Sequence, residues 1–262
     1  MPLTIDLTGK RALVTGASDG VGAGVASVLA RAGCQVVGTG TVAPDHPRAL
    51  VFLEEMAKAG VMARYLSGDF RIPAEPARLV EEAVGILGGL DIVVCNAGRN
   101  AFSGASSTSE EQWDENMNLN LASHWRLAKA AQPHLAMAQP GVLIVMGSNH
   151  AFHTFPGCFP YNVARSGLVG LVQALAIEWG PSIRVVGVAP GFIDTAGNQK
   201  WFDSFPDAAA ERARTNRMHP VGRIGTPEEV GNLCAFLASP LSGFITGNTI
   251  LMDGGRSALM QD

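Results

Sequence analysis

A phenol and a cation on one helix face are the residues of this chain best suited to acid–base chemistry. Tyr161 and Arg165 lie four positions apart, and residues at this spacing are neighbours on the surface of a helix. A neighbouring cation favours the ionised phenolate over the neutral phenol, so such a tyrosine can exchange a proton with a substrate. Ser148, further upstream, adds a hydroxyl group. The three side chains together predict an acid–base site.

The bulk properties favour a globular α/β protein that forms a single domain over residues 1–262. Hydrophobic residues make up 47% of the chain and charged residues 16%, with no repeat or linker. The net charge is −4 and no basic run occurs, so we expect neither a nucleic-acid nor a membrane partner. The scattered cysteines lack metal-ligand spacing, and no signal-peptide pattern is present. These features predict a reduced, cytoplasmic protein without a metal site.

Short β-branched runs alternate with helical patterns along the chain, which predicts a doubly wound parallel sheet flanked by helices. Several runs are almost wholly apolar, as expected of parallel strands that are covered on both faces. Two capping boxes, Thr108 to Glu111 and Thr226 to Glu229, mark helix starts. The expected strands are Ala12–Thr15, Gln35–Thr39, Ala63–Ser67, Ile92–Asn96, Val142–Gly147, Arg184–Ala189 and Thr249–Met252. The expected helices lie near 21–32, 47–59, 75–87, 109–138, 161–180, 207–217 and 227–238.

A glycine-rich turn, residues 15–22, joins the first expected strand to the first expected helix. Glycines allow a tight turn there and let backbone N–H groups approach a pyrophosphate at the start of the helix. The spacing T-G-x-x-x-G-x-G differs from the other dinucleotide-binding pattern, G-x-G-x-x-G.

This spacing resembles that of the short-chain dehydrogenase/reductase family, and the resemblance extends over nearly the whole chain. Gly68-Asp69-Phe70 follows the third expected strand, Asn96-Ala97-Gly98 ends the fourth, and residues 190–195 follow the sixth. In relatives these turns bind adenine, line the cofactor and hold the nicotinamide carboxamide. The resemblance implies a Rossmann-type, mostly seven-stranded parallel sheet with its ligand site at the carboxyl ends of the strands. The implied cofactor-binding residues are Gly16, Ser18, Asp19, Gly20, Val21, Gly22, Thr39, Thr41, Asp69, Phe70, Asn96, Ala97, Gly98, Tyr161, Arg165, Pro190, Gly191, Ile193 and Thr195.

The resemblance also implies an activity, which is the NAD(P)-dependent interconversion of a secondary alcohol and a ketone. Tyr161 is then the general acid/base, Ser148 binds the substrate oxygen, and Asn120 holds a proton-relay water. Arg165 stands where the family has lysine. Arginine supplies a permanent charge and several donors but hardly releases a proton. The alternative is a weakly active or inactive dinucleotide-binding homologue that acts as a sensor or scaffold.

The residues after the second expected strand leave the choice between NAD and NADP open. Thr39 and Thr41 are neither acidic nor basic, and a similar ending occurs in ketoacyl-carrier-protein reductases, which commonly use NADP. However, the carboxylate of Asp19 would repel a 2′-phosphate, although His46 and Arg48 would compensate if their loop folds back. On balance the sequence favours NAD.

The expected substrate contacts come from the loop after Ser148 and from residues 194–220, which we interpret as a lid. The side chains indicate an apolar or aromatic alcohol or ketone with a polar handle. Relatives are commonly tetramers, so a homo-oligomer, either a tetramer or a dimer, is expected. The candidate substrate residues are Asn149, His150, Phe155 and Trp201.

Overall fold

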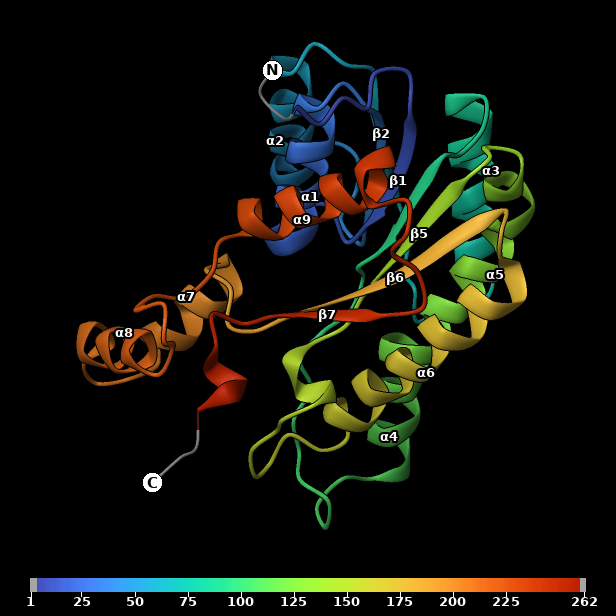
Figure 1. Cartoon of the computed structure of the whole chain (residues 1–262). Coiled ribbons are helices and arrows are strands. Elements are labelled where there is room, and N and C mark those ends of the chain that lie inside the picture. Colours follow the sequence, from blue (N-terminus) through green and yellow to red (C-terminus); the bar gives the residue numbers. More distant parts are fainter. Residues whose placement is uncertain (1–3, 260–262) are drawn as a thin grey trace.

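The computed structural model describes residues 4–259 and contains a seven-stranded parallel sheet (Figure 1). The strand order is β3-β2-β1-β4-β5-β6-β7, which confirms the expected Rossmann-type architecture. The order reverses between β1 and β4, and open α/β sheets bind ligands beyond the carboxyl ends of the strands at such a reversal. The strands are β1 (Arg11–Thr15), β2 (Gln35–Gly40), β3 (Ala63–Ser67), β4 (Ile92–Cys95), β5 (Gly141–Met146), β6 (Ile183–Pro190) and β7 (Thr249–Met252).

Helices cover both faces of the sheet, as Figure 1 shows, because successive strand residues point to opposite faces. In β1, Ala12 and Val14 pack in one buried cluster, with α1, α2 and α9, whereas Leu13 packs in the other, with α3, α5 and α6. The helices are α1 (Gly20–Arg31), α2 (Pro47–Lys58), α3 (Glu75–Leu87), α4 (Glu110–Met117), α5 (Ser123–Ala136), α6 (Tyr161–Trp179), α7 (Ala196–Asp203), α8 (Ala208–Arg217) and α9 (Pro227–Ala238).

The single helix expected over 109–138 is divided by a π-helical segment, Asn118–Ala122, between α4 and α5. The capping box that begins α4 also lies one residue later than expected, because Ser109 and Gln112 form it. The second expected box, Thr226 with Glu229, is confirmed. A wider π turn changes the direction of the side chains it carries, and this one carries Asn120.

Residues 194–220 are more regular than expected, because they form the two helices α7 and α8. The side chain of Thr195 caps α7 by accepting the Asn198 amide, and Asp207 caps α8 in the same way. The apolar side chains on α7 pack on one another and on the segments just before and after the helix. Rings of Phe192, Trp201, Phe202 and Phe205 form this cluster.

Candidate active site

The glycine turn after β1 forms a backbone cradle at the start of α1. Gly16 and Gly20 have φ of +67° and +59°, a region that favours glycine. A Cβ on Gly22 would collide with the Gly16 carbonyl oxygen. Asp19 caps α1 by accepting the Gly20 amide at 2.6 Å, while the remaining first-turn N–H groups have no acceptor within the helix. The cradle fits a pyrophosphate, which needs close backbone approach and free N–H donors.

Beyond β2, charged and hydroxyl groups surround the position expected for the adenosine ribose. The loop folds back as required for Arg48 to approach Asp19, with 3.9 Å between Nη1 and Oδ2. His46 instead caps α2 by accepting the Arg48 amide. The Thr39 hydroxyl is buried without a hydrogen bond among residues 4–259, whereas Thr41 is exposed. A Cβ on Gly40 would collide with the Tyr65 hydroxyl and approach the Ser18 hydroxyl, so Tyr65 lies here although sequence reasoning missed it.

The turn after β4 is fastened to the end of β1 by hydrogen bonds. The Thr15 hydroxyl accepts the amides of Asn96 and Ala97, each at 2.9 Å, and the Asn96 side chain donates to the Thr15 carbonyl at 2.8 Å. Beneath the turn, His124 Nε2 donates to the Ala97 carbonyl at 3.1 Å. His124 is buried, and burial followed by the charge of Arg165 lowers its pKa to about 3.

This pKa predicts a specific loss of stability in mild acid. His124 is neutral in the folded protein, whereas in the unfolded chain it takes up a proton near its ordinary pKa of 6.5. The free energy of unfolding is therefore highest above pH 6.5 and decreases as the pH falls towards 3. Each pH unit below 6.5 costs about 1.4 kcal/mol. In His124→Gln the glutamine amide can replace the Nε2 donor but does not titrate. The free energy of unfolding in urea should therefore fall by about 2 kcal/mol more in wild type than in this variant between pH 6.5 and pH 5. The same pH dependence of the free energy of unfolding in both proteins would contradict a buried neutral His124.

The turn after β6 meets the glycine cradle from the other side. A Cβ on Gly20 would lie 3.4 Å from Thr195 Cγ2, so both ends of the expected cofactor site converge. Pro190 ends β6, and Gly191 packs too closely against Asp253 for a side chain. Ile193 forms a bridge with Gly225.

The structure places Tyr161 and Arg165 side by side at the start of α6, both only 5% exposed. The guanidinium carbon of Arg165 lies 4.9 Å from the centroid of the Tyr161 ring, a cation–π arrangement. Ser148 follows β5, is 6% exposed, and accepts the His150 amide at 3.2 Å. The phenol, the cation and the hydroxyl therefore lie at the carboxyl edge of the sheet.

The Arg165 guanidinium has fixed acceptors. Nη1 donates to the Met146 carbonyl at 3.0 Å and Nη2 donates to the Asn120 Oδ1 at 3.1 Å. A Cβ on Gly98 would collide with Nη2, so glycine there makes room for the guanidinium. Arg165 has no ion pair with a carboxylate of the described chain, and its Nε has no acceptor there.

Asn120 braces Arg165 directly, and its side-chain amide is fully hydrogen-bonded. Oδ1 also accepts the Arg99 amide at 3.0 Å, while Nδ2 donates to the Arg99 carbonyl at 3.1 Å and to Asn116 Oδ1 at 3.3 Å. An amide offers two acceptor positions and two donors, so none is left on this side chain for a water. Arg99 and Met146 contact Asn120 and Arg165 through their main-chain N–H and C=O groups. Such contacts cannot be inferred from the residue type.

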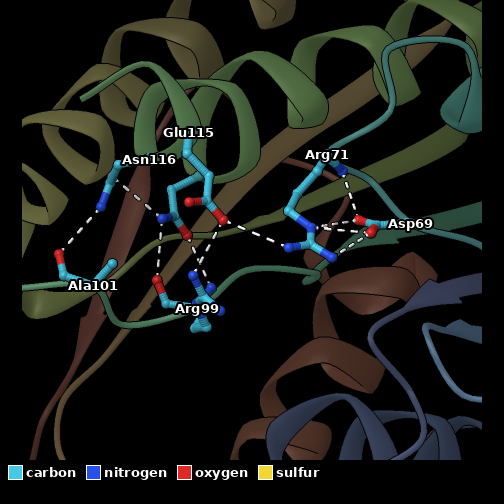
Figure 2. A network of polar contacts seen from close by, with 7 residues as sticks. Asp69, Arg71, Arg99, Ala101, Glu115 and Asn116 are labelled. Carbon is cyan, nitrogen blue, oxygen red and sulfur yellow. Dashed lines mark hydrogen bonds and ion pairs between the residues drawn. The ribbon is translucent and has the colours of Figure 1, made fainter. Parts of the chain in front are cut away.

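Figure 2 shows that alternating charges connect Asp69 to the Arg99 turn. Arg71 pairs with Asp69 at 2.6 Å and with Glu115 at 3.6 Å, and Glu115 also pairs with Arg99 at 3.2 Å. Hydrogen bonding to Arg71 lowers the pKa of Asp69, so this carboxylate is ionised at neutral pH. Phe70, the other expected adenine contact, is buried.

Three of the four expected substrate residues lie in the loop after Ser148, and one lies apart. His150 and Phe155 contact each other at 5.0 Å between ring centroids, and Asn149 Oδ1 accepts the Ser148 hydroxyl at 3.4 Å. Trp201 contacts the α7 aromatic cluster instead. Sequence reasoning missed Phe102, whose ring lies 5.5 Å from that of Tyr161.

A cavity of about 190 Å³ borders Asn120 and the loop that carries Phe102. Residues 4–259 contain no cluster of three potential metal ligands. No helix within that range combines the length and apolar character that crossing a membrane requires. The residues around the cavity are Arg99, Ala101, Phe102, Ser103, Gln112, Glu115, Asn116, Leu119, Asn120 and Pro160.

Comparisons with known proteins find similar sequences and structures over almost the whole chain. The profile of a family described as enoyl-(acyl carrier protein) reductase matches residues 16–257. The human dehydrogenase/reductase SDR family member 4 is 34% identical, covering 95% of this chain and 88% of the relative. A short-chain dehydrogenase/reductase structure from Serratia marcescens has a TM-score of 0.87 and 33% identity, with 96% and 99% coverage. A 3-oxoacyl (acyl-carrier-protein) reductase from Agrobacterium tumefaciens, solved with NADP bound, has a TM-score of 0.89, 28% identity, and 97% coverage of both chains.

Proposed function

The chain belongs to the short-chain dehydrogenase/reductase family, and from this premise we propose that it interconverts a secondary alcohol and a ketone with NAD(P). The observation that carries the proposal is the buried Tyr161–Arg165 pair, with Ser148 at the same edge of the sheet. Relatives are named dehydrogenases and reductases, which supports an oxidoreductase. The geometry supports a carbonyl group as the reacting function, because the phenol of Tyr161 can donate a proton to a carbonyl oxygen.

When bound, the dinucleotide supplies or accepts the hydride. Tyr161 gives a proton to the carbonyl oxygen in reduction and takes it back in oxidation. Ser148 donates a hydrogen bond to that oxygen and orients it towards the phenol. Asn96 and Thr15 hold the turn that lines the site. The cradle Gly16–Gly22, Thr195 and the turn at Gly191 are the groups that would hold the dinucleotide.

Arg165 supplies a fixed positive charge beside Tyr161 and does not serve as a proton carrier. Its cation lies over the Tyr161 ring, and its two outer nitrogens are engaged by Met146 and Asn120. A guanidinium keeps its proton under all physiological conditions. The Tyr161 hydroxyl must therefore exchange its proton with solvent by a route that does not pass through Arg165.

The assay that tests this function follows absorbance at 340 nm with NADH and with NADPH over a panel of ketones. We expect carbonyl-dependent oxidation of a reduced cofactor by the purified wild-type protein. Cofactor binding without turnover of any ketone or secondary alcohol would contradict the proposal and support the sensor or scaffold alternative.

For the cofactor, we propose NAD over NADP. Asp19 places a carboxylate beside Arg48, so the charge that would compensate a 2′-phosphate is already paired. Asp19→Asn keeps the helix cap, since asparagine also caps helices, but removes the charge. We expect kcat/KM for NADPH, relative to NADH, to rise about 10-fold in this variant. A wild-type preference for NADPH that the substitution leaves unchanged would contradict the assignment.

The segment 194–220 remains our proposed substrate lid, with Trp201, 39% exposed on α7, as its candidate contact. The homo-oligomeric state and the cytoplasmic location remain predictions from the sequence.

A further inference from the structure

Three aromatic rings form a connected cluster beside the reactive phenol. Phe102 lies 5.5 Å and His150 5.9 Å from Tyr161 between ring centroids, and Phe155 lies 5.0 Å from His150. Phe102 is 45% exposed and Phe155 50% exposed. Large rings left open beside a reactive group provide an apolar surface that an aromatic ligand can cover by edge or offset contacts.

The position of Phe102 is fixed relative to Tyr161. Phe102 forms an antiparallel bridge with Pro160, the residue just before Tyr161. The next two amides, of Ser103 and Gly104, donate to the Phe159 carbonyl at 2.9 and 3.1 Å. The Phe102 ring and the phenol therefore belong to one hydrogen-bonded unit, so this ring is suited to determine which substrates fit.

Arg256 begins a short helical turn that follows the carboxyl end of β7, and Figure 1 shows this segment in red. β7 ends at Met252, which pairs with Pro190 at the end of β6. The buried Asp253 carboxylate accepts the amides of Gly255 and Ser257 at 3.0 and 2.7 Å. These bonds hold the short helical turn Arg256–Ala258.

The guanidinium of Arg256 has no ion pair and no side-chain hydrogen bond with any residue in the range 4–259. By contrast, Arg212, Arg214 and Arg223 in the preceding segment each pair with a carboxylate. The nearby Asp253 is occupied by backbone amides. Arg256 is only partly exposed, and the nearby Asp253 carboxylate attracts it without forming a direct ion pair, so part of the cost of desolvating this cation stays uncompensated. An anion from outside the described chain would relieve this cost.

The charge of Arg256 acts on His150, which lies in the loop after Ser148. Burial lowers the pKa of His150, and the positive charge of Arg256 lowers it further. Burial also lowers the pKa of His219, and there the charge of Arg256 is opposed by that of Asp253. Arg214 is the other cation in range, and it lowers the pKa of Arg256 after burial. His150 thus contacts the Tyr161 ring and also lies within electrostatic range of Arg256.

We propose that the carbonyl substrate carries both an aromatic group, which packs on Phe102 and Phe155, and a carboxylate, which Arg256 binds. This inference rests on the proposed function and specifies its substrate class as aromatic oxo acids and the matching hydroxy acids. A guanidinium presents paired donors that match the two oxygens of a carboxylate. Phe102 and Arg256 are specificity residues, whereas the proton transfer belongs to Tyr161.

The test compares each acid with its own methyl ester, which keeps the ring and the ketone but removes the charge. Two pairs, 4-acetylbenzoate and benzoylformate with their esters, place the carboxylate at different distances from the ketone. We expect wild type to prefer the acid of at least one pair by about 10-fold or more in kcat/KM. Arg256→Gln should remove that preference by raising KM for the acid alone, and Arg256→Lys should restore part of it.

Phe102→Leu provides the matched test of the aromatic contact. We expect it to raise KM for the preferred aromatic acid by about 5-fold or more, with little effect on the aliphatic oxo acid levulinate. Equal use of acid and ester by wild type, or an equal loss for both in Arg256→Gln, would overturn the proposal.

Calorimetry with the oxidised cofactor present gives a readout that does not depend on turnover. Tighter binding of the acid than of the ester, lost in Arg256→Gln, supports the substrate class even if no turnover is detected. In that case the proposed reaction fails while the binding inference stands. If the enzyme turns over neutral ketones but shows no preference for the acids, the proposed reaction stands and the inferred substrate class fails.

Discussion

Replacing Tyr161 by phenylalanine is expected to lower kcat/KM for ketone reduction by about 10²- to 10⁴-fold, the usual contribution of a general acid. The substitution removes only the hydroxyl. The ring contacts with Phe102 and His150, and the position of the Arg165 guanidinium over the ring, do not require that oxygen. Structure and cofactor affinity should therefore be preserved while proton transfer is lost.

Initial rates at 340 nm, together with a fluorescence titration of NADH, separate these effects. We expect the dissociation constant for NADH to change by less than about 2-fold, because the Gly16–Gly22 cradle is untouched. Unchanged turnover in Tyr161→Phe would remove the phenol from the mechanism. A parallel loss of NADH binding would instead show that the hydroxyl acts in holding the cofactor.

Replacing Arg165 by methionine is expected to separate activity from stability. Activity should fall by about 100-fold or more, because the site loses the fixed positive charge that lies beside the reacting phenol. Stability should stay constant or rise, because a buried guanidinium without a carboxylate partner carries a desolvation cost that an apolar side chain avoids. The free Met146 carbonyl and Asn120 Oδ1 offset part of that gain, since each loses a donor.

Arg165→Lys is the matched variant, because it keeps the charge and restores the residue type found in the family. It should keep activity within about 10-fold of wild type, since a single ammonium group can retain the charge beside Tyr161. Urea unfolding and initial rates on both variants provide the measurement. An inactive wild type combined with an active Arg165→Lys variant would show that the arginine disables this chain.

The fold followed from the sequence because strand and helix patterns are local. The apolar strands predicted the parallel sheet, and the glycine turn at residues 15–22 was predicted to be a dinucleotide cradle after the first strand. The structure adds that this turn lies at the switch between β1 and β4. The π turn that carries Asn120 could not be predicted, because tertiary contacts with the Arg99 main chain fix it. α7 was missed because its cap residue, Thr195, was assigned to the cofactor turn alone.

The candidate site was predictable in part, for a related reason. Tyr161, Ser148 and Arg165 could be found because their types and spacing carry chemistry. Phe102 and Arg256 could not, since their contacts are visible only in the folded chain: Phe102 forms a bridge with Pro160, and Arg256 begins the short turn after β7. Residue type alone gives an arginine no special status, whereas the lack of an ion-paired carboxylate for Arg256 among residues 4–259 is a three-dimensional property.

The most direct test of the central claim is the transfer of deuterium from the nicotinamide to a carbonyl carbon. Wild-type protein would be mixed in a single turnover with NADH or NADPH deuterated at C4 and with an aromatic ketone, and the alcohol would be analysed by mass spectrometry. We predict one deuterium on the carbinol carbon with wild type and none within the same time with Tyr161→Phe. No labelled alcohol from wild type with either cofactor over the ketone panel would contradict the assignment of this site as a carbonyl–alcohol oxidoreductase.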